Sequence, residues 1–279
     1  MVEQPTCNRV TSKELLSKFR QSRRQGLSLR TLQFYDGTLY RASSVVGLNV
    51  VAQDIIRFLD DLPTSNGNKH AYYRCLRAFY NWLYSRRSGY NLNPQDNPIL
   101  AVEPPKVEQR IMPSLTQEQL DYVIEQAECL RDRAIISLFA DTGLRLAELT
   151  SINVDDIDWE HRLIRVWVKG NRQELAVFGE HTKSLLQAWL CEYKNHNGKL
   201  WDIGYWGINI LCRRLSAKTG LSCNPHTYRR TFASCLAKNG VNDIAIMKLG
   251  RWRSLGMVER YTRSVKFEDA LALYQPIVN

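Results

Sequence analysis

Apolar residues recur every three or four positions along most of the chain, which predicts a mainly helical protein. The first helix follows Thr11-Ser12-Lys13-Glu14, a capping box that begins a helix. Further helical patterns lie near residues 28–45 and 51–61. The clearest runs from Ala71 to Arg87, and its apolar residues form one stripe that is expected to be buried. The stripe consists of Tyr72, Leu76, Phe79 and Leu83.

A proline-rich segment interrupts the helical patterns. Five prolines lie between Asn91 and Pro113, at positions 94, 98, 104, 105 and 113. Because proline suppresses helix and favours extended chain, we expect a linker over residues 93–113. The sequence therefore predicts two domains, residues 1–92 and 114–279.

The second half combines helices with one small sheet. A second capping box, Thr116-Gln117-Glu118-Gln119, begins a helix that reaches about Cys129, and Asp132 to Asp141 is an apolar helix closed by Gly143. Residues 161–168 and 174–178 are rich in strand-forming residues on either side of Lys169-Gly170-Asn171-Arg172, which indicates a hairpin. The predicted fold class is mainly α (α+β), with helices and a small antiparallel sheet.

Composition and charge narrow the classes of function. The chain has 279 residues, of which 44% are hydrophobic and 24% charged, so low-complexity and fibrous classes are excluded. No apolar run approaches a bilayer span, and the Met1–Pro5 start has no signal-peptide pattern, so we expect a soluble, cytoplasmic protein. The net charge of +10 favours a polyanion as partner, either nucleic acid or an acidic membrane surface.

The positive charge is denser toward the N-terminus. Residues 1–103 carry a net +6 and residues 104–279 a net +4. On the predicted helix from Ala71 to Arg87, the polar residues Arg74, Arg77 and Asn81 share one face. An ordinary solvated face is the alternative, but the charge of this half favours contact with phosphates.

The cysteines do not indicate a metal or a disulfide framework. There are seven, irregularly spaced and without a Cys-x-x-Cys pair. Zinc on Cys212, Cys223, His226 and Cys235 is disfavoured, because structural zinc sites use paired short spacings. We expect no metal and no cofactor.

Two short motifs bring cations to helix ends. Asn224 and Pro225 are suited to begin a helix, which would place His226 and Arg229 on its first turn, where free N–H groups favour a phosphate. Arg145 lies at a glycine-broken junction in Thr142-Gly143-Leu144-Arg145-Leu146-Ala147-Glu148-Leu149. A partly buried arginine here either bonds an acid such as Glu148 or is held for an anionic ligand.

Five motifs in this order resemble the tyrosine recombinase (phage integrase) family. They are Arg145 in its Thr-Gly-Leu-Arg-Leu-Ala-Glu-Leu run, Lys169 in a hairpin turn, His226-x-x-Arg229, Leu249-Gly250-Arg251-Trp252 and Glu259-Arg260-Tyr261. Each is short and common alone, whereas all five in family-like order are not. The resemblance implies a core-binding domain followed by a catalytic domain, and it spans nearly the whole chain.

The resemblance also implies a role for each residue. Tyr261 would attack a DNA phosphodiester to form a 3′-phosphotyrosyl bond, while Arg145 and Arg229 hold the non-bridging oxygens. Lys169 would protonate the leaving 5′-oxygen, and His226 would assist proton transfer at the tyrosine. Trp252 would pack and donate to the phosphate, or serve only as a core aromatic, while Glu148 braces Arg145. Contacts to DNA are expected from Arg74, Arg77, Asn81 and Arg172.

Thirteen tyrosines compete for the role of nucleophile. Tyr228 lies inside the His226-x-x-Arg229 turn, Tyr274 lies on an apolar tail, and only Tyr261 has the flanking pattern of the family. The chain departs from the commoner pattern at Tyr228, where leucine is usual, and by an extra residue that leaves Arg251 or Trp252 to face the phosphate. The distance to Tyr261 favours Trp252.

The leading hypothesis is therefore a site-specific recombinase that cleaves and rejoins double-stranded DNA as a homotetramer on two sites, associated with the nucleoid. The alternatives are a relaxing enzyme similar to type IB topoisomerases and a catalytically inert DNA-binding relative. Accessory DNA-bending or directionality proteins are further expected partners. Phe267, Ala270, Leu271 and Tyr274 predict an amphipathic C-terminal helix that docks either on a neighbouring protomer or in cis.

Overall fold

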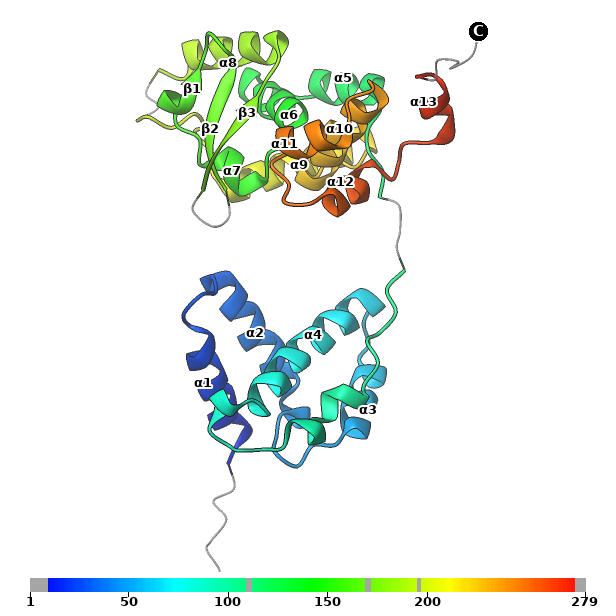
Figure 1. Cartoon of the computed structure of the whole chain (residues 1–279). Coiled ribbons are helices and arrows are strands. Elements are labelled where there is room, and N and C mark those ends of the chain that lie inside the picture. The colour runs from blue at the N-terminus through cyan, green and yellow to red at the C-terminus, as the bar shows by residue number, and fades with distance from the viewer. Residues whose placement is uncertain (1–9, 109–111, 169–171, 195–196, 274–279) are drawn as a thin grey trace, which may run out of the picture. The chain divides into compact units, whose positions relative to one another are not determined.

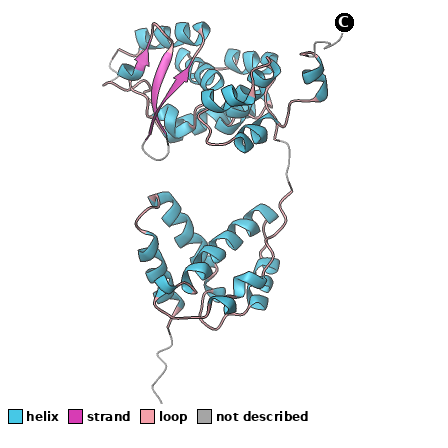
Figure 2. Cartoon of the chain, in the orientation of Figure 1, coloured by secondary structure: helices cyan, strands magenta, loops and turns pink. Residues whose placement is uncertain are grey.

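The computed structural model describes residues 10–108, 112–168, 172–194 and 197–273. The chain divides into two compact units, residues 1–109 and 110–279. Both are built mainly from helices, and the strands belong to the second unit (Figure 2). The predicted fold class is thus confirmed. No helix in these ranges is both long and apolar enough to cross a bilayer.

The N-terminal unit packs its helices around one central helix (Figure 1). The helices are α1 (Ser12–Arg23), α2 (Leu29–Arg41), α3 (Ala52–Asp61) and α4 (Asn66–Leu83), with short 3₁₀ turns η1 (Ser43–Val45), η2 (Arg86–Ser88), η3 (Pro94–Asp96) and η4 (Pro98–Ala101). The Thr11–Glu14 capping box is present at the start of α1. Along α4, Leu76, Phe79 and Leu83 are fully buried and form the centre of the core.

The proline-rich segment differs from the predicted extended linker in its first part. Residues 94–101 form the two 3₁₀ turns η3 and η4, and Ile99 and Val102 are buried in the N-terminal core. The Asn97 side chain donates a hydrogen bond to Asn81 of α4 and accepts one from the backbone of Ile99. Proline is compatible with the first position of a 3₁₀ turn. The segment with these prolines therefore packs on the N-terminal unit and does not form an extended linker.

The C-terminal unit is organised around a buried helix, α6. Its helices are α5 (Gln117–Glu125), α6 (Leu130–Thr142), α7 (Leu146–Thr150), α8 (Glu180–Glu192), α9 (Tyr205–Thr219), α10 (Pro225–Lys238), α11 (Asp243–Leu249), α12 (Leu255–Thr262) and α13 (Phe267–Leu271), with one 3₁₀ turn, η5 (Val154–Asp156). Nine residues of α6 are buried, and α5, α8 and α10 pack against it. Figure 1 shows α6 among these helices.

One antiparallel sheet lies at one end of this unit (Figure 2). Its order is β1 (Ile157–Asp158), β2 (Leu163–Val168) and β3 (Arg172–Val177). In β2 and β3 the register pairs Ile164 with Ala176, both buried, and Arg165 with Leu175, both exposed. The predicted hairpin is therefore present, and one face of its strands covers the core.

Two glycines end helices in the left-handed conformation but differ in their surroundings. Gly143 closes α6 with φ +56°, and a Cβ there would lie 2.6 Å from Phe232 Cδ1. Gly220 closes α9 with φ +71° and has no atom within 4 Å of such a Cβ. Both positions favour glycine for its backbone freedom, but Gly143 is also required for close packing.

We therefore predict that Gly143→Ala lowers the free energy of unfolding by about 2–4 kcal/mol, since it adds overpacking to the left-handed backbone cost. Gly220→Ala, the matched control, should cost about 1 kcal/mol. Urea unfolding of both variants measures the difference. Equal losses would show that packing against Phe232 contributes nothing.

Candidate active site

Arg145 and Glu148 form a braced pair at the junction of α6 and α7. After Gly143 turns the chain, Arg145 lies at the position before α7, and its backbone N–H donates to Glu148 Oε2 at 2.9 Å. Its guanidinium donates to Glu148 Oε1 at 2.6 Å. The Glu148 carboxylate is 4% exposed and the Arg145 side chain 39% exposed. The predicted acid partner is thus present, while part of the cation still faces solvent.

His226 and Arg229 occupy the first turn of α10. Asn224 caps this helix by accepting from the N–H of Thr227 at 3.0 Å, and Pro225 is its first residue. The two side chains lie in different environments. Arg229 is only 1% exposed, whereas His226 lies at the surface.

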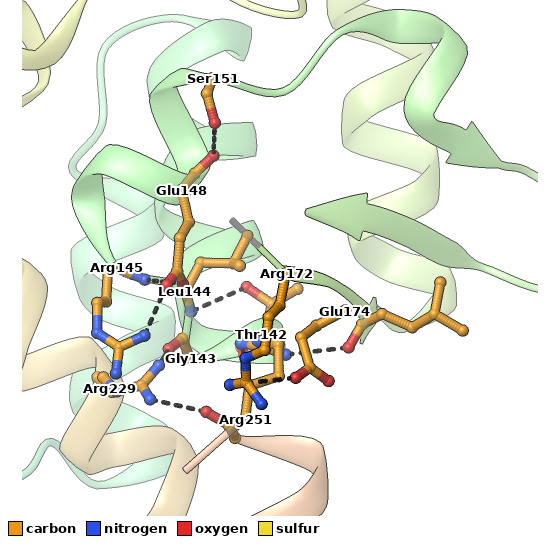
Figure 3. A network of polar contacts seen from close by, with 12 residues as sticks. Thr142, Gly143, Leu144, Arg145, Glu148, Ser151, Arg172, Glu174, Arg229 and Arg251 are labelled. Atoms are coloured by element: carbon orange, nitrogen blue, oxygen red, sulfur yellow. Dashed lines mark hydrogen bonds and ion pairs between the residues drawn. The ribbon is translucent and has the colours of Figure 1, made fainter. Parts of the chain in front are cut away.

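Arg229 binds two backbone carbonyls from separate helix ends. Its Nη1 donates to the carbonyl of Gly143, after α6, and its Nη2 donates to that of Gly250, after α11, at 2.7 Å. Figure 3 shows Arg229 and Arg145 side by side next to Gly143. Helix C-termini carry partial negative charge, so these carbonyls stabilise a buried cation. Arg229 Nε has no hydrogen-bond partner among the described residues.

Tyr261 stacks on Trp252, and the Arg229 guanidinium lies near both rings. The Tyr261 ring, on α12, stacks on the Trp252 ring with centroids 5.1 Å apart and planes 23° apart. The Arg229 guanidinium lies 4.6 Å from the Trp252 centroid and 5.8 Å from that of Tyr261. Such cation–π contacts are favourable when they are desolvated. Trp252 is 5% exposed, and its Nε1 has no partner among the described residues.

The charges around the site alter several pKa values. Burial, followed by repulsion from Arg145 and Arg251, lowers the pKa of Arg229 to about 10, so it stays charged at neutral pH. The pKa of His226 is lowered by desolvation and by the cations of Arg230, Arg229 and Arg145. The site therefore combines permanent cations with an imidazole that is neutral at pH 7.

Arg230, on α10 near His226, is a further arginine beside the site, and the sequence analysis did not single it out. Its Nε donates to the carbonyl of Pro113 at 2.9 Å, and its Nη2 donates to Thr227 Oγ1 at 2.9 Å. It fixes the start of the C-terminal unit to α10 and adds positive charge near His226. The sequence indicated Arg230 only by its position directly after Arg229. Adjacent residues of a helix point in different directions, so this position did not predict a place beside the site.

Tyr228 is excluded as a competing nucleophile by its burial. It is fully buried, and its ring stacks on Phe139 with the planes 10° apart. Burial raises the pKa of its hydroxyl far above the ordinary value. Tyr274, the other competitor considered, lies outside the described residues.

The remaining predicted residues are distributed over both units. Arg74, Arg77 and Asn81 are all exposed on α4, although Asn81 already accepts from Asn97. Arg172, exposed at the start of β3, pairs with Glu174 at 3.4 Å. Lys169 lies outside the described residues. Within those residues, no three His, Cys, Asp or Glu side chains are grouped to hold a metal ion.

Comparison with known proteins places these motifs in a family. The model of the Phage integrase family matches residues 113–267, more than half of the chain. The chain belongs to this family. It is therefore a tyrosine-type site-specific recombinase, and neither the topoisomerase-like alternative nor the inert alternative is favoured.

Two relatives and one solved structure illustrate the similarity. Tyrosine recombinase XerA of Saccharolobus solfataricus is 35% identical over 162 residues, which cover 58% of this chain and 55% of that one. Tyrosine recombinase XerC of Syntrophus aciditrophicus is 28% identical over 222 residues, 71% and 70% of the two chains. A lambda integrase tetramer bound to a Holliday junction shares the fold, with a TM-score of 0.75 and 16% identity over 94% of this chain and 81% of that one.

The lowered pKa of His226 predicts a dependence of stability on pH. The unfolded chain, with a histidine of pKa near 6.5, takes up this proton before the folded chain does as the pH falls. His226 therefore contributes nothing to the change in stability above about pH 7.5 and destabilises the fold as the pH falls below about 6.5. In urea unfolding at pH 7.5 and 5.5, His226→Asn should lose less stability than the wild type. An identical loss in both proteins would contradict the cationic setting of the ring.

Proposed function

We propose that Tyr261 of this recombinase attacks a phosphodiester of double-stranded DNA. The observation that carries the proposal is the stack of Tyr261 on Trp252 and Arg229, which puts the only ring with the family's flanking pattern beside a buried cation. The phenol oxygen forms a bond to phosphorus, and the bond from phosphorus to the 5′-oxygen breaks. The product is a 3′-phosphotyrosyl link and a free 5′-hydroxyl, so the energy of the phosphodiester is kept for rejoining.

Arg145 and Arg229 are proposed to hold the non-bridging oxygens of the phosphate. Arg145 is braced from behind by Glu148, so its partly exposed guanidinium is fixed before DNA binds. Arg229 Nε and Trp252 Nε1 are buried donors without partners among the described residues, and an anion that enters the site would satisfy them. A planar, permanently charged guanidinium suits a transition state that gains negative charge.

Proton transfer completes the proposed mechanism. Desolvation and nearby arginines lower the pKa of His226, so its imidazole is neutral at pH 7 and is proposed to accept the proton of the tyrosine. Lys169 is proposed to protonate the leaving 5′-oxygen, as the family resemblance implies. The cations also favour the phenolate that forms during attack, since a free phenol has a pKa near 10. No metal or cofactor enters this scheme.

Binding to DNA is proposed to rest on exposed basic side chains. Arg74 and Arg77 lie on one exposed face of α4, with Asn81 at the same face, and Arg172 lies at the start of β3. Contacts of this kind are made mainly to phosphates, so affinity should fall steeply with salt. As a DNA-bound protein of net charge +10, the recombinase is expected on the nucleoid, with accessory bending or directionality proteins as further candidates.

We predict that Tyr261→Phe keeps DNA binding but forms no covalent adduct. The phenylalanine ring is able to keep the stack on Trp252, and only the attacking oxygen is lost. On a nicked suicide substrate, adduct formation should fall by at least about 10³-fold. The matched control is Tyr122→Phe, an exposed tyrosine of α5, which should form adduct at the wild-type rate. An adduct from the Tyr261 variant would remove this residue from the role.

We further propose that four copies act on two DNA sites and contact one another through α13. Phe267 and Leu271 of α13 are 76% and 55% exposed, so its apolar side lacks a cover within the described chain. Contacts in cis also exist: Lys238 pairs with Asp269 at 3.0 Å, and Leu273 lies near Gly240. The lambda integrase tetramer on a Holliday junction supports this stoichiometry by analogy.

Removal of the exposed apolar side chains of α13 should therefore impair assembly of the protomers and leave DNA binding by each protomer intact. Phe267→Ser combined with Leu271→Ser keeps both cis contacts, and it should leave single-site DNA affinity within about threefold while synapsis and recombination fall together. Truncation after Lys266 should behave in the same way. Recombination at the full rate by the double variant, or unfolding of the truncated monomer, would instead support docking in cis.

A further inference from the structure

The end of α11 adopts a glycine-favouring turn with an arginine at its key position. The N–H of Arg251 donates to the carbonyl of Lys248 at 3.0 Å, and the N–H of Trp252 donates to that of Met247 at 2.9 Å. These two bonds form a Schellman motif, in which the residue after the cap takes the left-handed conformation. That residue is Arg251, with φ +55°. A side chain with a Cβ is disfavoured there, so the sequence retains arginine at a conformational cost.

The glycine of this turn lies one residue earlier and serves packing. Gly250 has φ −82°, a value that other residues adopt freely. A Cβ on Gly250, however, would lie 2.2 Å from Cζ3 of Trp252. The turn thus folds the indole back over its own backbone, and in this position the ring meets Arg229 and Tyr261.

The Arg251 side chain connects this turn to two other elements. It is 5% exposed, and its Nη2 donates to the carbonyl of Thr142, at the end of α6, at 2.6 Å. Its Nη1 donates to the carbonyl of Leu249 at 2.7 Å and reaches that of Leu175 in β3 at 3.4 Å. Figure 3 shows the guanidinium beside Thr142.

Arg251 and Arg229 together join the same two helix ends. Arg251 binds the carbonyls of Thr142 and Leu249, and Arg229 binds those of the next residues, Gly143 and Gly250. Attraction to Glu148 and Glu174 partly offsets the burial that lowers the pKa of Arg251 to about 10, so it remains a cation at neutral pH. Both Nη groups of Arg251 are thus engaged with backbone carbonyls, while its Nε is buried without a partner among the described residues.

We propose that Arg251 is a positioning residue that holds Trp252 against Arg229 and Tyr261 by fastening the end of α11 to the end of α6. The inference rests on the proposed roles of Trp252 and Tyr261 in cleavage. The proposal explains why arginine occupies a conformation that favours glycine. Its side chain bonds the end of α11 to the end of α6, and among the described residues the backbone of the turn makes no such contact by itself. Trp252, one residue later, is then the group that faces the reacting tyrosine.

Arg251→Gly tests the inference, because glycine keeps the left-handed turn and removes only the side chain. The expected result at saturating DNA is a fall of at least about tenfold in the rate of adduct formation, with DNA affinity and melting temperature close to wild type. Arg251→Lys, which keeps the charge without the fork, should restore part of the rate. Cleavage by Arg251→Gly at the wild-type rate would overturn the proposal.

Arg162→Gly is the matched control. Arg162 has φ +54°, but its exposed side chain pairs with Glu180, so this variant should cleave at the wild-type rate. An equal loss of rate in both variants would show that the effect is general to such turns, and it would overturn the specific role of Arg251.

A second readout is independent of DNA and of the proposed reaction. The indole N–H resonance of Trp252, assigned by its loss in Trp252→Phe, should shift or broaden in Arg251→Gly and stay in place in Arg162→Gly. An unchanged resonance in Arg251→Gly would overturn the inference even if cleavage slows. If the wild type forms no adduct but the resonance shifts, the positioning stands and the proposed function fails.

Discussion

The site depends on the contacts that the buried guanidinium of Arg229 makes. It bonds the carbonyls of Gly143 and Gly250, which follow α6 and α11, and it lies against the rings of Trp252 and Tyr261. A single side chain therefore connects the segment that carries Arg145 with the segments that carry Trp252 and Tyr261. Because a buried arginine without partners is very costly, these carbonyls have to stay in place for the fold to persist.

A cluster of cations is unfavourable unless its charge is compensated. Arg145 has a carboxylate partner in Glu148, whereas Arg229 and Arg251 use carbonyls at helix ends, where the backbone carries partial negative charge. This group of side chains therefore keeps an excess of positive charge, which a phosphate bound as proposed would neutralise. Desolvation and the same excess of charge lower the pKa of His226 and leave it neutral, as its proposed role in proton transfer requires.

Much of the architecture followed from local patterns. Capping boxes predicted the starts of α1 and α5, and Gly143 predicted the end of α6, because these signals act over three or four residues. The linker prediction was less accurate. Proline content alone does not distinguish an extended chain from 3₁₀ turns that pack on a core, and Ile99 and Val102 provide that packing.

The sequence by itself indicated the family through the order and spacing of its motifs. The pairing of Arg145 with Glu148 was one of two interpretations of the residues alone, and the family resemblance favoured it. Only the tertiary structure decided that Arg251 turns toward carbonyls of α6 while Trp252 stacks on Tyr261. The two residues are adjacent, and their directions depend on a left-handed turn and on partners such as Thr142, more than one hundred positions away. Contacts over such separations leave no local periodicity to detect, because they form only when distant helix ends meet.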